Sequence, residues 1–250
     1  VLLGHGSSGK TTLGEAMLHK AKVTSRLGSV DDGTSHLDFT DIEKGRKHTI
    51  DPSMAYFDHA GTTINIIDTP GYPDFIGGAI SASGGADIAV IVISAHAGIE
   101  VNTRRMFKLA QANNMPVAII INKIDDENAD LESILTHINE TFGSACKPMN
   151  LPTGENTAII GCFANKEGSS DLGDVADART ELIDNIVEAD EELMEAYLGD
   201  EELTAAQLSN AMSKAMIAGT VIPILFTAAK SDVGITEAMD AIAKYFPSPV

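Results

Sequence analysis

Short apolar runs rich in Val and Ile alternate with longer segments of helical period along the 250-residue chain. Such alternation predicts βα units and a mostly parallel central sheet flanked by helices, the α/β class. Strands are expected at Val1–Gly4, Ser53–His59, Thr62–Ile67, Asp87–Ser94, Val117–Asn122 and Val221–Phe226, and helices near Thr11–Lys22, Glu100–Ala112, Asp130–Thr141 and Ile235–Tyr245. Only Ala60-Gly61 separates the second strand from the third, which indicates a hairpin.

Two regions interrupt this alternation. Residues 24–50 are polar, mixed in charge and nearly without periodicity, so we predict a long mobile loop, and such a loop in a compact domain is usually functional. Residues 144–218 begin with a loop-rich stretch and continue with apolar residues at helical spacing among many acids. We interpret residues 144–218 as an inserted α+β subdomain within a core formed by residues 1–143 and 219–250.

A glycine-rich loop follows the first strand and leads directly into the first helix. It reads Gly4-His5-Gly6-Ser7-Ser8-Gly9-Lys10-Thr11-Thr12 and fits the phosphate-binding pattern of a P-loop NTPase fold. Glycines allow the backbone N–H groups to point at phosphate oxygens, and the helix adds its positive N-terminal end. Lys10 would reach the β- and γ-phosphates, and the Thr11 hydroxyl would bind Mg²⁺. A glycine-rich turn with an exposed lysine is the alternative, and the loop alone does not separate ATP from GTP.

A second candidate segment, Asp68-Thr69-Pro70-Gly71-Tyr72, ends the third expected strand. Asp68 would hold Mg²⁺, through a water molecule, and the Gly71 N–H would meet the γ-phosphate. An aspartate before a Pro-Gly turn can also simply cap that turn.

Two later segments concern the base. Asn122-Lys123-Ile124-Asp125 follows an apolar strand, and the Asp125 carboxylate can accept hydrogen bonds from the guanine N1–H and 2-amino groups, a donor pair that adenine lacks. Asn122 and Lys123 would brace the site. The weaker motif Thr227-Ala228-Ala229-Lys230 would offer a backbone N–H to the guanine 6-oxo group, although a plain strand-to-helix turn explains it nearly as well.

Charge and composition narrow the classes of partner. The chain has 36 acidic and 17 basic side chains, a net charge of −19, which argues against direct nucleic-acid binding by this domain. No apolar run approaches the roughly 20 residues that span a bilayer, so we expect no membrane association. Two widely spaced cysteines predict neither a disulfide framework nor a zinc site, and a reducing cytoplasm is the expected setting.

The order of these motifs resembles the G domain of translation elongation factor G, and in particular the elongation-factor-G-like paralogues. The resemblance also rests on Asp68–Phe75, Glu191–Leu198 and the ending Phe246-Pro247-Ser248-Pro249, and it spans essentially the whole chain. It implies a GTPase domain that binds GTP or GDP with Mg²⁺ and cooperates with the ribosome, possessing the family's inserted subdomain in shortened form. It also implies a fragment of a larger translational GTPase, because the family continues into four further domains after the segment that the tail resembles.

The same resemblance assigns residues 24–50 to the first switch loop. The stretch Glu43–Ile50 is similar to the family's segment in which an arginine precedes a threonine by three positions, so Thr49 matches the threonine that closes on Mg²⁺ and the γ-phosphate. Lys47 and His48 stand where the family usually has Gly and Ile. The other interpretation of Thr49 is an exposed threonine at a strand entrance.

Two residues depart from the family pattern near the γ-phosphate. Tyr72 stands where the family has a histidine that positions the attacking water, and a phenol does not carry positive charge at neutral pH. Ser7 stands where the family usually has an aspartate linked to a monovalent cation. We therefore predict tight nucleotide binding with intrinsic hydrolysis of order 10⁻⁴ s⁻¹, with Lys10, Gly71 and Tyr72 as the residues nearest the chemistry.

Three hypotheses remain open at this point. The first is a GTPase whose switch loops, residues 24–50 and 68–85, order around the γ-phosphate. The second is a module that senses GTP against GDP with negligible hydrolysis and acts through its partners. The third, a P-loop ATPase or kinase, requires the Asn-Lys-Ile-Asp motif to be accidental. Ribosome-dependent hydrolysis and the Tyr72→His variant distinguish the first two, and ATP competition tests the third.

The negative charge is concentrated in the expected insertion. Residues 167–202 contain fourteen Asp or Glu and one Arg, a net charge of −13. A solvated acidic helix face is the ordinary explanation. The alternative is an electrostatic docking face, for which the family resemblance names the ribosomal stalk.

Overall fold

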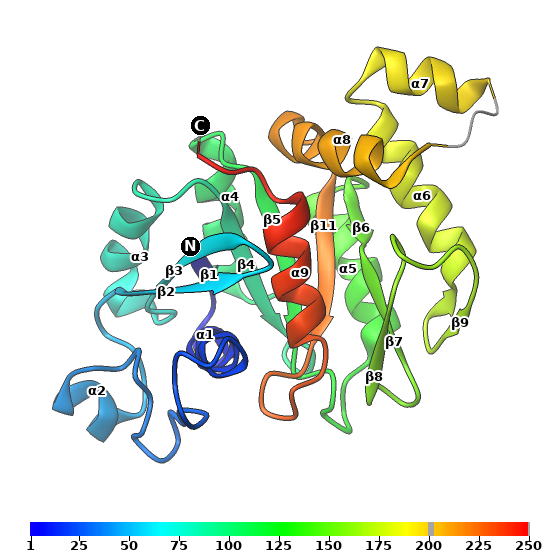
Figure 1. The fold of residues 1–250 in the computed structure, drawn as a ribbon. Coiled ribbons are helices and arrows are strands. Elements are labelled where there is room, and N and C mark those ends of the chain that lie inside the picture. The colour runs from blue at the N-terminus through cyan, green and yellow to red at the C-terminus, as the bar shows by residue number, and fades with distance from the viewer. Residues whose placement is uncertain (200–202, 250) are drawn as a thin grey trace.

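The computed structural model describes residues 1–199 and 203–249, and a seven-stranded sheet forms its centre (Figure 1). The strands are β1 (Leu2–Gly4), β2 (Ser53–His59), β3 (Thr62–Asp68), β4 (Ala89–Ser94), β5 (Val117–Asn122), β6 (Cys146–Pro148) and β11 (Ile222–Thr227). Their order is β2-β3-β1-β4-β5-β11-β6, and β2 runs antiparallel to β3 while the other neighbours are parallel. The predicted α/β class with a mostly parallel sheet is confirmed.

Helices connect the strands. They are α1 (Lys10–Lys20), α2 (Asp41–Arg46), α3 (Ile76–Ser83), α4 (Val101–Ala112), α5 (Leu131–Phe142), α6 (Val175–Val187), α7 (Glu191–Leu198), α8 (Ala205–Ala218) and α9 (Ile235–Tyr245), with a 3₁₀ turn at Pro73–Phe75. Two small hairpins pair β7 (Asn150–Thr153) with β8 (Ala158–Gly161) and β9 (Ser169–Ser170) with β10 (Gly173–Asp174). In the described residues no helix is long and apolar enough to cross a membrane.

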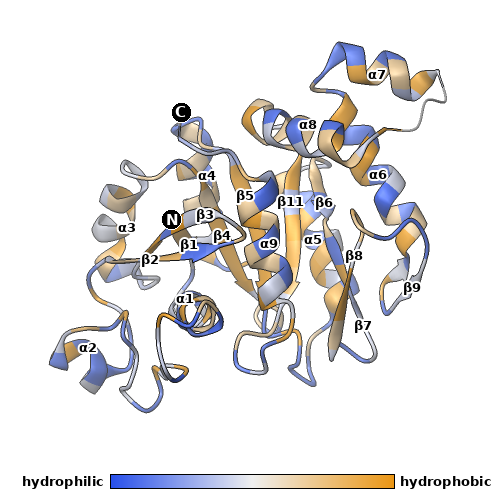
Figure 2. Ribbon diagram, viewed as in Figure 1, coloured by the Kyte–Doolittle hydropathy of each residue, from blue (hydrophilic) through white to orange (hydrophobic). Residues whose placement is uncertain are grey.

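The central strands are buried on both faces, which explains their continuous apolar runs. Along β4, Val90 and Val92 join the core beneath α1 and α9, whereas Ile91 and Ile93 join the core beneath α4 and α5. Figure 2 shows that the central strands are hydrophobic, whereas the surrounding helices mix hydrophobic and hydrophilic residues. The sheet edge formed by the ends of these strands is therefore rigidly placed.

The hairpin expected at Ala60-Gly61 is present. β2 and β3 are paired along their whole length, with Ser53 opposite Asp68 at one end and His59 opposite Thr62 at the other. Ala60 has φ 49° and Gly61 has φ 81°, the positive values that a two-residue turn of this hand requires. The register brings Asp68 to the end of β3, next to β1.

Residues 24–50 contain regular structure that the sequence pattern did not reveal. The six-residue helix α2 begins after a capping box, in which Thr40 accepts from the Glu43 N–H and Glu43 accepts from the Thr40 N–H. The prediction of a loop without regular structure is wrong at these residues, because local capping rather than apolar periodicity stabilises so short a helix.

The expected insertion, residues 144–218, contributes one strand to the central sheet. β6 pairs with β11 in a register that places Cys146 beside Ile222 and Pro148 beside Ile224. Leu182 of α6 and Met212 of α8 belong to the same hydrophobic core as Leu13 of α1. Figure 1 places α7, which belongs to these residues, at the opposite end of the molecule from α2. The division of the chain into a core and an insertion stays a prediction.

Candidate nucleotide-binding site

Four loops meet at the carboxyl ends of the parallel strands. Residues 4–11 follow β1, residues 68–72 end and follow β3, residues 122–125 follow β5, and residues 227–230 follow β11. In open α/β sheets this edge is where ligands bind. A cavity of about 160 Å³ opens there, lined by Gly6, Ser7, Gly9, Lys10, Thr11, Thr12, Val30, Asp31, Lys47, His48, Thr49, Thr69, Gly71, Tyr72, Lys123 and Lys230.

Lys10 is the buried cation of this cavity. Its ammonium group donates to the His5 carbonyl at 2.8 Å and to the Gly4 carbonyl at 3.4 Å, so the loop's own backbone holds it. Burial lowers the pKa of Lys10 to about 8, and Asp68 and Glu100 oppose that shift. A phosphate group would supply the negative charge that this desolvated ammonium lacks.

Gly71 approaches the phosphate loop so closely that a side chain does not fit. A Cβ at this position would lie 2.5 Å from the His5 carbonyl oxygen and 2.6 Å from the Gly6 nitrogen. Asn102 of α4, which the sequence did not single out, holds the Gly71 carbonyl through a 2.8 Å hydrogen bond from its amide. The backbone of Gly71 is therefore fixed beside Lys10.

Thr11, Thr49 and Asp68, the three predicted metal-binding residues, lie in direct contact. The Thr11 hydroxyl donates to Asp68 Oδ2 at 2.7 Å, and the Thr11 and Thr49 hydroxyl oxygens are 2.9 Å apart. Asp38, which the sequence did not reveal, accepts from the Thr49 hydroxyl at 2.8 Å. The first switch loop thus meets the phosphate loop and the end of β3 at one cluster.

The cluster has the donor set that Mg²⁺ prefers, which is made of oxygen atoms alone. Burial raises the pKa of Asp68 to about 7 and also raises the pKa of Asp38. Because each threonine has only one hydroxyl proton, the two hydroxyl oxygens face each other without a proton between them when both carboxylates are ionised. Asp68 Oδ1 is also buried without a hydrogen-bond partner. A divalent cation would offset both deficits.

Asn122 joins three of the four loops. Its amide nitrogen donates to the Ser8 and Gly9 carbonyls at 3.4 Å each, and its oxygen accepts from the Ala229 N–H at 3.1 Å. Lys123 extends over the loop and donates to the Ser7 carbonyl at 2.8 Å. These contacts hold the loops together, and the bracing of a base by this pair stays a prediction.

Asp125, the predicted guanine ligand, is exposed and stands outside the cavity lining. The Ser231 hydroxyl donates to its carboxylate at 2.7 Å, a partner that sequence reasoning missed. In the loop after β11, the Ala228 N–H donates to Val233 at 2.9 Å and the Ala229 N–H is taken by Asn122. A base oxygen would therefore have to meet another N–H group of this loop.

The remaining predicted residues have largely structural contacts. The Thr69 hydroxyl donates to the Leu2 carbonyl at 2.6 Å, and Ser8 is buried. His5 lies 3.4 Å from Glu100 through its Nε2. Thr227 donates to Asn122 at 3.3 Å. Pro70 is buried in its turn, whereas the neighbouring Tyr72 is 39% exposed.

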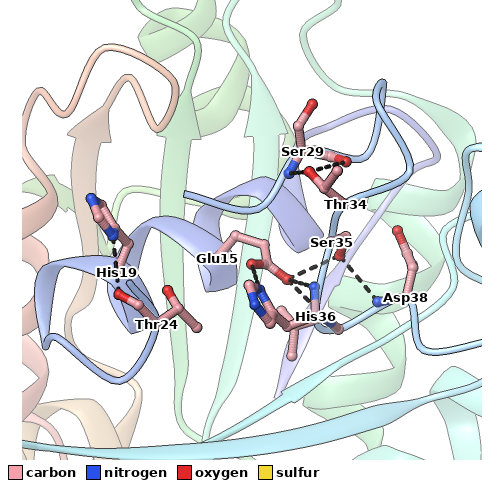
Figure 3. Close-up of polar contacts among 9 residues, drawn as sticks. Glu15, His19, Thr24, Ser29, Thr34, Ser35, His36 and Asp38 are labelled. Atoms are coloured by element: carbon pink, nitrogen blue, oxygen red, sulfur yellow. Dashed lines mark hydrogen bonds and ion pairs between the residues drawn. The ribbon is translucent and has the colours of Figure 1, made fainter. Parts of the chain in front are cut away.

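The predicted first switch loop, residues 24–50, is anchored by Glu15 of α1 (Figure 3). This fully buried carboxylate accepts from the Ser35 hydroxyl at 2.9 Å, from the Leu37 N–H at 2.8 Å, and from the N–H of His36. The His36 ring nitrogen Nδ1 lies 2.9 Å from the second carboxylate oxygen. Four contacts to one side chain fix the segment that leads to Asp38.

The loop also closes over the outer side of the cavity. Asp31 and Lys230 form an ion pair of 2.7 Å that connects the first switch loop to the loop after β11. Lys230 holds the pKa of Asp31 below its ordinary value through a hydrogen bond and its charge. Because both side chains are more than two-thirds exposed, this contact contributes little energy but marks where the loop crosses the site.

Comparison with known proteins gives one family across the chain. The profile described as "Elongation factor Tu GTP binding domain" matches residues 1–248. The elongation factor G-like protein of Mycobacterium tuberculosis is 34% identical over 265 aligned residues, which cover 100% of this chain and 37% of that protein. Elongation factor G of Fervidobacterium nodosum is 33% identical, with 100% and 39% covered.

A crystal structure of a protein from Thermus thermophilus has the same fold. It superposes with a TM-score of 0.90 and 31% sequence identity, over 99% of this chain and 40% of that one. This chain therefore spans about two fifths of the length of the relatives that it matches.

Proposed function

The chain belongs to the family of elongation factor Tu GTP-binding domains, and we propose that it binds GTP and GDP with Mg²⁺ and hydrolyses GTP slowly when alone. The carrying observation is that the four nucleotide motifs meet at one sheet edge, where the Thr11 hydroxyl contacts both Thr49 and Asp68. This cluster would respond to the presence or absence of the γ-phosphate, because Thr49 belongs to the first switch loop.

The phosphate end of the site would work through fixed charge and fixed backbone. Lys10 would neutralise the β- and γ-phosphates, and Gly71 would donate its N–H to the γ-phosphate. When bound, Mg²⁺ would supply charge neutralisation between these phosphates, held by Thr11 and Thr49 and by Asp68 through a water molecule. The closed position of Thr49 supports a loop that orders around the γ-phosphate.

The base end of the site would select guanine. Asp125 would accept from the guanine N1–H and 2-amino groups, and the Ser231 hydroxyl orients that carboxylate at 2.7 Å. Adenine would leave the carboxylate without donors, which costs roughly 10⁴-fold in affinity. Asn122 and Lys123 would hold this loop against the phosphate loop.

Slow intrinsic hydrolysis follows from Tyr72 and Ser7. A phenol cannot carry an imidazolium's positive charge near the γ-phosphate at neutral pH, and Ser7 adds no carboxylate for a monovalent cation. A switch protein without its stimulating group turns over at about 10⁻⁴ s⁻¹. The ribosome is the proposed partner of the whole protein, because relatives covering this chain are named elongation factor G.

The second candidate is a module that distinguishes GTP from GDP with negligible hydrolysis. Tyr72 at the water-positioning place favours it. Single-turnover hydrolysis of γ-labelled GTP, measured over hours with and without ribosomes, separates the two. Release of phosphate in either condition supports the GTPase, and retention of intact GTP in both conditions supports the sensing module. A rate of about 1 s⁻¹ without ribosomes would contradict the proposal of slow intrinsic turnover.

A further inference from the structure

A histidine of the first switch loop lies beside Tyr72 at the phosphate end of the cavity. His48 lines the same cavity as Lys10, Thr49 and Gly71. Its ring centroid is 4.9 Å from that of Tyr72 and 6.1 Å from that of Phe75. The chain therefore has an imidazole at this place, although residue 72 is not a histidine.

The turn that carries His48 is held by the side chain and the backbone carbonyl of one buried residue, Glu43. Glu43 of α2 accepts from the Ile50 N–H at 3.0 Å and from the Asp51 N–H at 3.1 Å, while its backbone carbonyl accepts from the His48 N–H at 3.3 Å. Thr49, between His48 and Ile50, contacts Thr11. Closing the loop on the phosphate end therefore also fixes the backbone of His48.

The hydrogen bond of the ring defines which nitrogen has a free lone pair. His48 Nδ1 lies 2.9 Å from the Arg46 carbonyl oxygen. A carbonyl can only accept, so Nδ1 carries the proton and Nε2 of the neutral ring is an acceptor. A group that orients an attacking water must accept a hydrogen bond from one of its O–H groups.

Tyr72 packs against the phosphate loop. A Cβ at Gly6 would lie 3.1 to 3.2 Å from three atoms of the phenol ring, so the ring covers the backbone of Gly6. His48 contacts this ring at an interplanar angle of 57°. The phenol ring therefore packs against both the Gly6 backbone and the imidazole ring.

We propose that His48 is a catalytic residue for GTP hydrolysis, with Nε2 accepting a hydrogen bond from the attacking water. This assignment rests on the proposed function. The water oxygen forms a bond to the γ-phosphorus, and the bond from that phosphorus to the bridging oxygen breaks with its electron pair leaving on GDP. The water proton passes to the released phosphate, and His48 orients the water without keeping the proton.

One aromatic substitution tests the assignment. His48→Phe retains a ring against Tyr72 but removes the Nε2 acceptor. We expect His48→Phe to lower the single-turnover rate, measured at saturating GTP with and without ribosomes, by at least about tenfold. His137→Ala, on the exposed face of α5, controls for loss of a histidine and should change this rate less than threefold.

Binding of fluorescent GTP and GDP to the same proteins separates this role from a structural one. Affinities within about twofold of wild type, together with the rate loss in His48→Phe, support the assignment. Wild-type hydrolysis by His48→Phe, or a tenfold loss in His137→Ala, would overturn it while leaving the proposed function intact. A parallel loss of GTP affinity in His48→Phe would also overturn it. Failure of the wild type to bind guanine nucleotides would instead contradict the proposed function.

Discussion

At the scale of single residues, two threonine hydroxyls lie between two buried carboxylates. Thr11 donates to Asp68 and Thr49 donates to Asp38, at 2.7 and 2.8 Å. Without a cation, ionising Asp68 is costly because burial removes its water. This cost to the stability of the ion-free protein supports the proposal that the cluster binds an ion.

A stability measurement on metal-free protein tests that interpretation. Burial raises the pKa of Asp68 from 3.8 to about 7 in the folded state. The stability from this group is therefore fully present below pH 3.8 and is lost as the pH rises through 7. In Asp68→Asn this loss is absent, so the variant should gain several kcal/mol relative to wild type between pH 4 and pH 8, at about 1.4 kcal/mol per pKa unit.

Urea unfolding in EDTA at several pH values gives the comparison. Asp74→Asn, which removes an exposed carboxylate within the 3₁₀ turn, should keep the wild-type pH dependence. Equal pH dependence of Asp68→Asn and wild type would show that Asp68 is not the titrating group.

The hydrogen bond from Ser231 to Asp125 gives a second prediction at this scale. Ser231→Ala should weaken GTP binding about fivefold, because a typical hydrogen bond contributes about 1 kcal/mol. Ser209→Ala is the matched control, since its exposed hydroxyl also makes one hydrogen bond, at 2.9 Å to Lys244, away from the cavity. Equilibrium titration with fluorescent GTP measures both, and equal affinities would remove Ser231 from the base site.

Residues within the motifs could be predicted, and their partners could not. The order of the motifs and the family resemblance predicted one metal site from three separate segments, which contribute Thr11, Thr49 and Asp68. Asp38 and Ser231 stand outside any motif, so their places depend on how loops pack in three dimensions. The same is true of Asn102, which holds Gly71 from the other side of the sheet.

At the scale of elements, Glu15 connects α1 to the first switch loop. Glu15→Ala leaves the Ser35 hydroxyl and the N–H groups of His36 and Leu37 without their buried acceptor. Each such group costs about 1 to 3 kcal/mol, so we expect a destabilisation of about 3 kcal/mol or more. Amide hydrogen exchange at residues 36–38 should become faster.

Two variants sharpen this prediction. Glu15→Gln keeps one acceptor oxygen and should lose less than half as much stability, whereas Glu132→Ala removes an exposed carboxylate of α5 and should change neither quantity. Unchanged exchange protection at residues 36–38 in Glu15→Ala would show that the loop is held by other contacts.

Elements with a strong period were predicted well, and short elements were not. β2, β5 and α9 have the expected bounds, because alternation or helical period continues over their whole length. α2 depends on the Thr40 and Glu43 capping box, and β6 is a three-residue strand that ends in Pro148. Such elements form because tertiary neighbours complete them, which a local pattern does not report.

At the scale of the whole molecule, the acidic charge lies away from the candidate nucleotide site. Glu188, Glu191, Glu192 and Glu195 are all exposed, on or next to α6 and α7, and Figure 1 shows α7 at the opposite end from α2. Of the fourteen acids in residues 167–202, Asp200, Glu201 and Glu202 lie outside the described residues. A charged face of this kind would influence association more than nucleotide chemistry.

Replacing these four glutamates by glutamine tests the docking interpretation. We expect slower association with ribosomes, with a weaker dependence on ionic strength, and unchanged affinity for GTP. Stopped-flow association at two salt concentrations measures the first, and fluorescent GTP titration measures the second. Association kinetics equal to wild type would leave the acidic surface as a solvated helix face.

Guanine recognition at the four-loop edge is the central claim, and nucleotide competition tests it most directly. Fluorescent GTP bound to the protein with Mg²⁺ is challenged with unlabelled GTP, GDP or ATP. Equimolar GTP and GDP should compete effectively, whereas a thousandfold excess of ATP should displace little, since the expected discrimination is roughly 10⁴. Displacement by ATP at concentrations similar to those of GTP would contradict the assignment of Asp125 and with it the guanine site.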